Sequence, residues 1–467
     1  MKKYFKFYKL IFYKYNYIYL YYIFNIINKK KNKIYILKKL NILNKKKYIY
    51  LNNKIKKNFF KKKKYKKIRK EFDHRILYKK NNLFFFKKKM PGLIFWNKNG
   101  YIIWKNINKY IRNNIYIKYN YKEIKTPIIL RDYFWKKTKH WNYYKKNMFL
   151  LKTKNKKYAL KPMNCPGHIQ IYNYKKISYK KLPLKYGEIG ECFRNEYTGS
   201  LHGILRLKNF NQDDGHIFCK KNQILLELIK FNNICKKVYK NFNFKNIKIK
   251  LSLRPKKKIG NNYLWNLSEK ILLKIILFFN IKIKNIEKNG AFYGPKIEYY
   301  LKDLNKKIWQ CGTIQIDFII SKILNLNYNN KYNIKKNIII LHRAILGSIE
   351  RFIGILIENN KGYIPFYLIP IQIVIININN KILKYTNNII KILKKNKFRI
   401  KKIINNNNLS LKLKKYFSYK SYFCILIGNK ENKKKSIFLK IKNNINLGFI
   451  KIKKFIFFLN IIKKNNI

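Results

Sequence analysis

Residues 187–219 constrain the possible fold more than any other stretch of the chain. The segment EIGECFRNE alternates in polarity and predicts a β-strand, TGSLHG predicts a turn that contains glycine, and ILRLKNFNQDDGHIF predicts a returning strand. Five of the chain's eighteen acidic residues lie in this stretch: Glu188, Glu191, Glu196, Asp213 and Asp214. We therefore expect the chain to fold around an antiparallel hairpin rich in polar chemistry.

Two side chains of this hairpin suggest a ligand. Arg194 and Glu196 are two residues apart, so on a strand they would project from the same face. An arginine offers a rigid fork of donors that suits a phosphate, and a nearby carboxylate accepts from an amino group such as that of adenine. An ion pair across a solvated hairpin is the alternative, and the pattern alone does not choose between the two.

Charge is the dominant feature of the composition. The chain has 110 Lys and Arg against 18 Asp and Glu, a net charge of +92, which would ordinarily indicate a nucleic-acid partner. However, the excess is mostly Lys and comes with abundant Asn, Ile, Tyr and Phe, which are the residues of A- and T-rich codons. We therefore attribute much of the charge to compositional drift in a reduced bacterial genome or an organelle genome, and only part of it to function.

The cysteines indicate a reducing compartment. Six are spread through the chain, and none belongs to a CxxC motif or a paired framework. Residues 15–28 are apolar but shorter than the ~20 residues that a membrane span requires. We therefore expect a cytoplasmic protein without a membrane partner.

The chain divides into three parts by composition. Residues 1–70 contain no acid, Gly, Pro, His or Cys and predict a basic low-complexity extension. Residues 71–364 predict a globular domain, with a short hairpin around Asn99 and Gly100, a strand with Pro127 near its middle, a helix over 221–240, and a strand ending at His342 before another helix. Residues 365–467 alternate strands with helices and predict a separate α/β domain with a mixed sheet.

Several motifs occur in an order that resembles the threonyl-tRNA synthetase family of class II aminoacyl-tRNA synthetases. They are DHR, KTKHW, KPMNCPGH, RNE, SLHG, FNQDDGHIF, GAFYGPKIE, QCGT and HRAILGSIERFIGIL. The resemblance is strong from residue 71 to about 365 and weaker beyond. It implies an α+β fold, in which a class II antiparallel sheet flanked by helices is followed by a C-terminal α/β anticodon-binding domain with a mixed sheet.

The resemblance also implies a metal site. Cys165, His216 and His342 would hold one Zn²⁺ per subunit and leave an open position for the substrate. The CPGH tetrapeptide alone would be weak evidence, because a buried cysteine is usually an inert small hydrophobe.

The remaining implied roles belong to activation of threonine by ATP and transfer of threonine to the 3′ end of tRNA-Thr. His140 would accept a proton in the transfer step, and the region around Pro127 would form a homodimer interface. Threonine would contact Asp214, Tyr293, Gln212, Gln310 and Gln315. ATP, bound with Mg²⁺, would contact Arg194, Glu196, Arg206, Phe210 and Arg351, with Lys296 near its phosphates.

The sequence departs from the family pattern at several positions. Phe193 replaces a usual His, and Gly215 replaces a usual Ala. In the last domain Asn406 and Glu431 fall where the family reads the anticodon, but Lys440 replaces an Arg and cannot reproduce bidentate contacts. Residues 1–70 contain no His or Cys, so we expect no editing of mischarged seryl-tRNA.

Three other functions compete with this one. A class II synthetase for serine or proline is disfavoured by the set Cys165, His216 and His342. An inactive RNA-binding paralogue would be expected to lose Arg194, Arg351 or a metal ligand, and all of them are present. A generic cationic protein that coats RNA would not explain the clustered acids.

Overall fold

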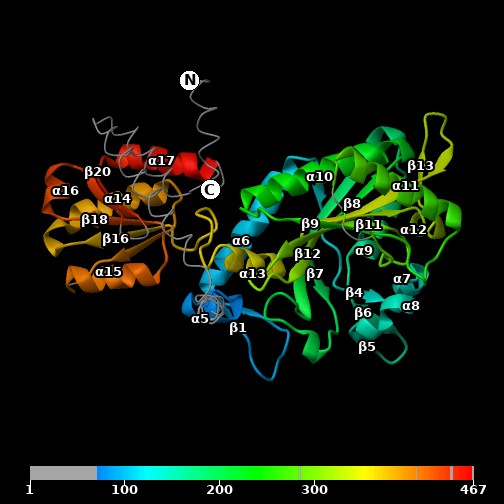
Figure 1. The fold of residues 1–467 in the computed structure, drawn as a ribbon, viewed down its shortest axis with the longest axis horizontal. Helices are drawn as coiled ribbons and strands as arrows, with labels where there is room; N and C mark the ends of the chain where they lie inside the picture. The colour runs from blue at the N-terminus through cyan, green and yellow to red at the C-terminus, as the bar shows by residue number, and fades with distance from the viewer. Residues whose placement is uncertain (1–70, 282, 284–285, 406, 442–444, 465–467) are drawn as a thin grey trace, which may run out of the picture. The chain divides into compact units, whose positions relative to one another are not determined.

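The computed structural model describes residues 71–281, 283, 286–405, 407–441 and 445–464. The described residues form two compact units, which lie within residues 71–364 and 365–464 (Figure 1). The predicted basic extension, residues 1–70, lies outside the described residues.

An eight-stranded sheet forms the centre of the first unit (Figure 1). Its neighbouring strands are antiparallel except for the pairs at the two edges, β10 with β9 and β3 with β7. In spatial order the strands are β10 (Ile286–Glu287), β9 (Lys248–Ser252), β11 (Lys296–Lys302), β12 (Ile308–Asp317), β15 (Ile339–Ser348), β8 (Asn209–Cys219), β7 (Leu184–Phe193) and β3 (Lys122–Glu123). The predicted antiparallel sheet is therefore confirmed.

Long helices cover this sheet. Helix α10 (Ile224–Asn241) packs on β12 and β15 and against α11 (Asn262–Phe278). Helix α13 (Ile349–Asn359) packs on β8, β11 and β15 and contacts α5 (His74–Lys80) and α6 (Lys98–Ile111). With helices against it, β15 is buried at every position from Ile339 to Gly347.

Smaller elements surround the sheet. The other strands are β1 (Phe84–Phe85), β2 (Phe95–Trp96), β4 (Ile129–Arg131), β5 (Leu150–Lys152), β6 (Lys157–Leu160), β13 (Asn327–Asn329) and β14 (Lys335–Asn337). The other helices are α7 (Asp132–Lys137), α8 (His140–Tyr144), α9 (Cys165–Asn173) and α12 (Ile320–Ile323). Strands β4, β6 and β5 form a separate three-stranded sheet.

The second unit is a five-stranded mixed sheet with helices on both faces. Its strands, in spatial order, are β17 (Ile400–Ile403), β16 (Ile373–Asn377), β18 (Phe423–Ile427), β19 (Ile437–Ile441) and β20 (Ile445–Ile450). Its helices are α14 (Leu383–Lys395), α15 (Leu409–Ser418), α16 (Asn429–Lys433) and α17 (Ile452–Lys464). Strands β17, β16 and β18 are parallel to one another, whereas β19 pairs antiparallel with both β18 and β20, as predicted for a mixed sheet.

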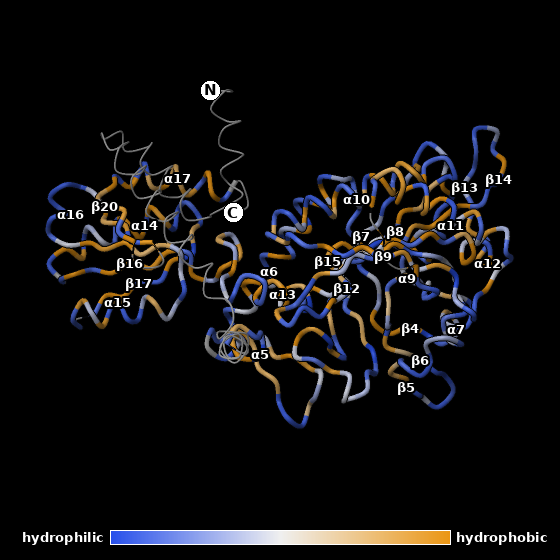
Figure 2. The backbone as a smooth tube through the Cα atoms, in the orientation of Figure 1, coloured by the Kyte–Doolittle hydropathy of each residue, from blue (hydrophilic) through white to orange (hydrophobic). Residues whose placement is uncertain are grey.

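Alternation along β16 builds the two cores of this unit. Ile373 and Ile375 join a cluster with α14 and α17, whereas Val374 and Ile376 join a second cluster that includes Tyr416 of α15. Side chains of a strand point to opposite faces in turn, so a continuous apolar strand serves both layers. Figure 2 shows hydrophobic residues along these strands and hydrophilic residues in the surrounding loops.

Some local predictions were wrong. β7 ends at Phe193 and β8 begins at Asn209, so Arg194 and Glu196 lie beyond the strand and the argument that they share a strand face does not apply. Pro127 lies between β3 and β4, where its missing N–H breaks no ladder.

Two further boundaries differ from the prediction. Asn99 and Gly100 are inside α6 rather than in a hairpin turn. His342 is in the middle of β15 rather than at its end, because the strand continues to Ser348. Among the described residues, no helix has both the length and the apolar character needed to cross a bilayer.

Candidate active site

The register of three central strands places polar side chains in one row. His216 of β8 lies opposite His342 of β15, and His342 lies opposite Gln315 of β12. Asp214 is two residues from His216 and shares its face, and Glu188 of β7 lies opposite Asp214. One face of the sheet therefore carries two imidazoles flanked by carboxylates.

Helix α9 adds a thiol to this row. Cys165 and His168 are three residues apart in its first turn, so they lie on the same side of the helix. The sulfur of Cys165 and one ring nitrogen each of His216 and His342 all lie within 4.8 Å of one another. The fold thus brings together three buried side chains from distant parts of the sequence.

Hydrogen bonds determine which way these imidazoles face. His342 Nε2 lies 3.0 Å from Asp317 Oδ2, and the other oxygen of Asp317 accepts from two backbone N–H groups. Because an ionised carboxylate only accepts, the proton of a neutral His342 is on Nε2 and its Nδ1 carries a lone pair. That Nδ1 lies 2.9 Å from His216 Nε2.

His216 is oriented by a second set of contacts. Burial lowers its pKa well below 6.5, so the ring is neutral. Its Nδ1 lies 2.8 Å from His168 Nδ1, and His168 Nε2 lies 3.0 Å from Glu188 Oε2. With His168 Nε2 donating to Glu188, a neutral His168 accepts at Nδ1, and His216 Nε2 is left with a lone pair.

In these tautomers two lone pairs are directed at each other, and a cation between them would relieve their repulsion. Nitrogens bound to one tetrahedral zinc at ~2.0–2.1 Å lie about 3.3 Å apart, so the observed 2.9 Å separation requires only a small outward shift. Burial raises the pKa of Cys165, so a thiolate there requires a positive partner. The donor set fits Zn²⁺.

Asp214 and Tyr293 lie beside this group. Asp214 Oδ2 accepts from Asn164 Nδ2 at 3.0 Å, and burial raises its pKa. The buried ring of Tyr293 has its centroid 5.1 Å from that of His342 and 5.6 Å from that of His140.

The three glutamines predicted to contact threonine lie on β8 and β12. Gln315 donates to the carbonyl of Gly294 at 2.9 Å. Gln212 is on β8 two residues before Asp214, and Gln310 is on β12 opposite Tyr300. Gln212 and Gln315 therefore border the row that carries the imidazoles.

His140 is fully buried at the start of α8. Its Nδ1 lies 2.8 Å from Thr138 Oγ1, and its Nε2 has no hydrogen-bond partner among the described residues. Burial lowers its pKa to about 3, so the ring is neutral near pH 7. An unpartnered buried nitrogen is costly unless a ligand satisfies it.

Of the predicted nucleotide-binding arginines, Arg194 and Arg206 lie in the loop between β7 and β8, and Arg351 contacts this loop. Arg351 of α13 donates to the carbonyls of Leu205 at 2.7 Å and Gln310 at 2.9 Å. The Cζ of Arg194 lies 5.1 Å from the centroid of the Phe210 ring. These contacts hold Arg351 against the loop and Arg194 over the ring of Phe210.

Two other predicted residues make ion pairs. Glu196 accepts from Arg206 at 2.7 Å, so Glu196 pairs with Arg206 and not with Arg194. The ion pair that was the alternative interpretation is therefore present. Lys296 Nζ lies 2.7 Å from Glu298.

Sequence reasoning assigned no role to His168 or Glu188, although both lie in the quoted motifs. The spacing of Cys165 and His168 was the available signal, because it places both on one side of a helix. The position of Glu188 beneath them depends on strand register, which the sequence does not show.

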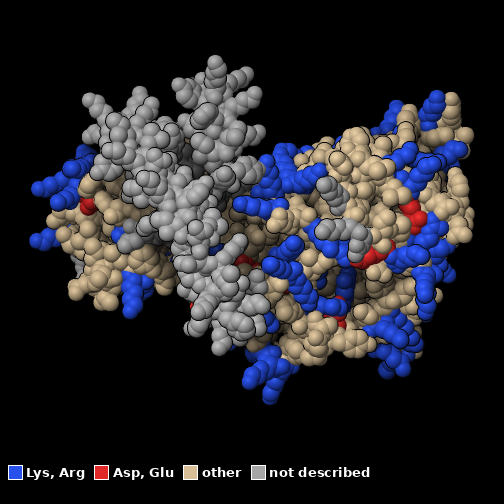
Figure 3. Space-filling model, in the orientation of Figure 1, with Lys and Arg blue, Asp and Glu red and all other residues tan. Residues whose placement is uncertain are grey.

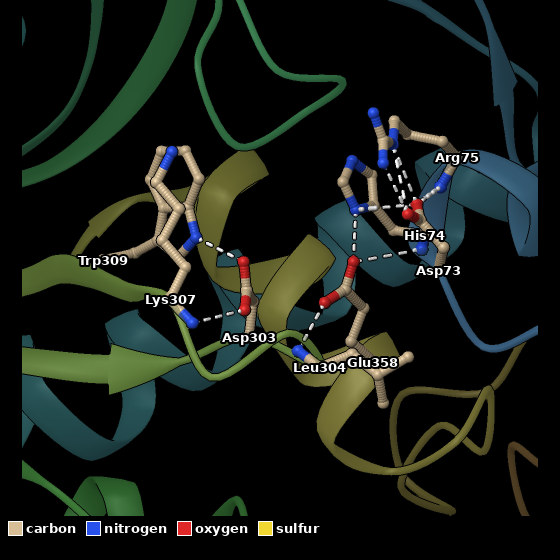
Figure 4. Close-up of polar contacts among 8 residues, drawn as sticks. All are labelled: Asp73, His74, Arg75, Asp303, Leu304, Lys307, Trp309 and Glu358. Atoms are coloured by element: carbon tan, nitrogen blue, oxygen red, sulfur yellow. Dashed lines mark hydrogen bonds and ion pairs between the residues drawn. The ribbon is translucent and has the colours of Figure 1, made fainter. Parts of the chain in front are cut away.

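A second group of ligand-capable side chains, Asp73, His74 and Glu358, lies between α5 and α13 (Figure 4). Both oxygens of Asp73 accept from the Arg75 guanidinium. Glu358 accepts from His74 Nδ1 at 2.6 Å and from the backbone of Leu304 at 2.8 Å. These carboxylates are already satisfied, so the group joins the two helices as a structural network.

The predicted anticodon residues lie in the second unit. Glu431 is buried and accepts from the backbone N–H of Gly428 at 2.7 Å, which caps α16. Lys440 is on β19 and half-buried, and Asn406 lies outside the described residues.

Comparison with known proteins identifies the family. The RNA-binding domain of threonyl-tRNA synthetase from Cryptosporidium parvum Iowa II superposes with a TM-score of 0.80 and 32% identity, over 84% of this chain and 98% of that one. The chain belongs to the threonyl-tRNA synthetase family. A putative threonyl-tRNA synthetase from Aeropyrum pernix is also similar, with a TM-score of 0.73 and 25% identity over 84% of this chain and 96% of that one.

Family models and curated relatives agree with this assignment. Residues 149–360 match the tRNA synthetase class II core domain (G, H, P, S and T), and residues 372–460 match the anticodon binding domain. Threonine–tRNA ligases of Polynucleobacter necessarius and Buchnera aphidicola are each 43% identical, over 82% and 83% of this chain. The chain spans 60% of the length of these relatives. The fold is thus that of a class II threonyl-tRNA synthetase core with its anticodon-binding domain.

Proposed function

We propose that this chain is a threonine–tRNA ligase, which activates threonine with ATP and transfers it to the 3′ end of tRNA-Thr. The convergence of Cys165, His216 and His342 carries the proposal, because it offers a selective site for an amino acid with a side-chain hydroxyl. Membership of the threonyl-tRNA synthetase family supports it.

Cys165, His216 and His342 would hold one Zn²⁺ per subunit. When bound, the ion supplies Lewis-acid coordination for the amino and hydroxyl groups of threonine, a contact that valine lacks. A site built for a hydroxyl rejects an isosteric methyl group strongly, whereas it rejects serine poorly.

Other side chains orient threonine. Asp214, held by Asn164, and Tyr293 face the amino group, and Gln212, Gln310 and Gln315 shape the pocket. The threonine carboxylate is ionised near neutral pH, so its attack on the α-phosphorus of ATP needs no general base. Positioning and charge neutralisation therefore provide most of the rate enhancement.

The arginines would bind ATP. Arg194 reaches the α-phosphate, and Arg351 and Arg206 clamp the outer phosphates, while Mg²⁺ neutralises further charge and Lys296 lies nearby. Phe210 stacks on adenine, and Glu196 accepts from its amino group. For these contacts Arg194 leaves the face of Phe210 and Glu196 exchanges the Arg206 ion pair for the adenine amine.

His140 would assist the transfer to tRNA. It is neutral and has an unpartnered Nε2, so it can accept a hydrogen bond from the terminal ribose hydroxyl, although a pKa of about 3 makes it a weak base for taking up the proton. The ring faces Tyr293, which places it near the bound threonine.

The second unit would bind the anticodon of tRNA-Thr. Its match to the anticodon binding domain supports this role, with Glu431 and Asn406 as the candidate base contacts. Lys and Arg side chains spread over the visible surface in Figure 3 suit an RNA backbone. We place the activity in the cytoplasm, where its tRNA substrate would be charged.

We also propose a homodimer. Strands β4 and β5 expose Ile129, Leu150 and Leu151, and Ile128 precedes them, each at least 36% exposed. The register of the three strands places Ile129 and Leu151 on one face of this small sheet, and exposed apolar side chains on one face suit an interaction surface. Sedimentation of the purified protein should give a dimer that Ile129→Lys dissociates, and a wild-type monomer would contradict the assignment.

One experiment tests the function. Purified protein should contain one equivalent of zinc and catalyse ATP–pyrophosphate exchange with threonine but not with valine or proline. Cys165→Ser should lose both, whereas Cys424→Ser, which changes a buried cysteine of the other unit, should lose neither. Exchange that depends on serine or proline but not on threonine would refute the proposal.

A further inference from the structure

The contact between His216 and His168 has a consequence for the metal site. The two rings lie with centroids 4.5 Å apart and planes tilted by 72°, and their Nδ1 atoms are 2.8 Å apart. Both side chains are fully buried. One Nδ1 must donate and the other accept, so the two rings determine each other's tautomer.

Glu188 determines which atoms donate and which accept in this series of hydrogen bonds. Its Oε2 lies 3.0 Å from His168 Nε2 and accepts from Thr126 Oγ1 at 2.8 Å. Its Oε1 accepts from the Thr126 backbone at 3.0 Å and from Lys161 Nζ at 3.1 Å. A buried carboxylate surrounded by donors and paired with a lysine is ionised and only accepts, so His168 Nε2 carries a proton.

The tautomer of His168 in turn determines the tautomer of His216. A neutral His168 with its proton on Nε2 accepts at Nδ1, and His216 must therefore donate from Nδ1 and carry its lone pair on Nε2. The opposite tautomer of His216 would place a proton on the nitrogen that faces Cys165 and His342, where it would block a metal. His342 is oriented directly by Asp317, whereas His216 is oriented through a second imidazole.

The sequence around His168 suits this task. Gly167 lies against Thr126, and a Cβ at Gly167 would be 2.8 Å from Thr126 Cβ. The glycine therefore lets the first turn of α9 approach the residue that binds Glu188. The same turn supplies Cys165 as a candidate ligand and, three residues later, His168.

We propose that His168 and Glu188 are positioning residues for the zinc site, a relay that holds His216 in the tautomer and orientation that bind metal. This inference rests on the proposed function, because it assumes that zinc occupies the site. Partners that orient a ligating histidine typically change metal affinity by 10–100-fold when they are removed.

Two substitutions separate the relay from simple packing. His168→Phe keeps an aromatic ring but removes the acceptor for His216 and the donor for Glu188. His168→Gln keeps one acceptor and one donor on a flexible side chain. We expect zinc affinity to fall about 10–100-fold in His168→Phe and to be partly restored in His168→Gln.

The chain offers a matched control. His74 is a fully buried histidine that bonds a buried glutamate, Glu358, in the separate network of Figure 4. His74→Phe removes the same kind of buried pair and should leave zinc affinity unchanged.

The test uses the full-length chain without threonine or ATP. Zinc affinity is measured by competition with a chromophoric chelator, and the visible spectrum of the Co²⁺-substituted protein reports on the coordination of His216. The relay predicts weaker binding and an altered cobalt spectrum in His168→Phe, with both recovering toward wild type in His168→Gln.

Three outcomes overturn the inference. Wild-type affinity and an unchanged cobalt spectrum in His168→Phe would show that His216 needs no relay. Equal losses in His168→Phe, His168→Gln and His74→Phe would show general destabilisation. Absence of zinc binding in the wild type would remove the proposed metal site itself, and that result is distinct because it needs no variant. If His168→Phe fails to fold, His168→Gln alone still decides, because a zinc affinity below that of wild type with a changed cobalt spectrum supports the relay, whereas wild-type affinity with an unchanged spectrum refutes it.

Discussion

Asp317 and Glu188 act on the site through imidazoles rather than by touching substrate. Each is a buried carboxylate at the end of a hydrogen-bonded path to a candidate metal ligand. Such carboxylates are stable only while their donors remain in place, since an unpaired buried charge is very costly. The chemistry of the site is therefore linked to the stability of the surrounding fold.

The ionisation of Glu188 provides a test of this link. Burial raises the pKa of Glu188, but hydrogen bonds from His168 and Thr126 and the charge of Lys161 outweigh burial and hold the pKa at about 2. A carboxyl group with a lowered pKa stabilises the fold above its ordinary value of 4.5, and that contribution is lost as the pH falls toward 2. The lowered pKa corresponds to about 3 kcal/mol at neutral pH.

We expect Glu188→Gln to unfold at a lower urea concentration than wild type at pH 7. The difference should shrink as the pH falls from 4.5 toward 2, because wild-type Glu188 then becomes neutral as well. Urea unfolding at pH 7, 4 and 3 measures it, with Glu123→Gln as the control at an exposed ion pair. A difference that stays constant over this pH range would contradict the assignment.

At the scale of elements, the junction between β15 and α13 depends on one glycine. Gly347 has φ +68°, and a Cβ there would lie 2.4 Å from the backbone oxygen of Cys311. An ordinary side chain would thus add backbone strain and push β15 away from β12. Because α13 follows at Ile349, this junction also determines the position of Arg351.

Gly347→Ala should destabilise the first unit by roughly 2–3 kcal/mol. Hydrogen exchange of peptides from β15 and α13 should accelerate, because the two elements separate locally. Gly199→Ala is the control, since nothing lies within 4 Å of a Cβ at that position. Equal protection in the two variants would show that the junction tolerates the displacement.

The local sequence pattern predicted the existence of elements more accurately than it predicted their ends. The alternating segments of the hairpin indicated strands correctly, because side-chain period is a local property. The ends of β7 and β15 were misplaced, because tertiary pairing extends or shortens a strand beyond its local pattern. Pro127 falls in a connection for the same reason.

The candidate site was less accessible to such reasoning. Cys165, His216 and His342 meet because β8 pairs with β15 in one register, and residues 126 positions apart give no local signal of that pairing. The family resemblance supplied the ligands, but it did not supply His168 or Glu188, whose contacts depend on the packing of α9 over β7.

At the scale of the whole molecule, the net charge of +92 raises the question of specificity. Lysines distributed over a surface attract phosphates of any RNA, so they raise affinity without distinguishing one tRNA from another. Discrimination must then come from base contacts, which depend much less on salt than phosphate contacts do. Charge that arose by drift would therefore raise the affinity for every tRNA without changing the preference for tRNA-Thr, the proposed substrate.

We expect binding of tRNA-Thr and of a non-cognate tRNA to weaken in parallel as salt rises, by about 10³-fold or more between 50 and 200 mM if six or more phosphates are contacted. The ratio of the two affinities should stay constant, because base contacts add the same free energy at each salt concentration. Fluorescence-anisotropy titrations over a salt series measure, for each tRNA, the slope of the logarithm of affinity against the logarithm of salt concentration. Mg²⁺ is held at a fixed low concentration so that divalent competition is constant. A non-cognate slope much shallower than the cognate slope would show that the phosphate contacts form only in the specific complex. The surface lysines would then contribute to recognition itself, and their number could not be attributed to codon bias alone.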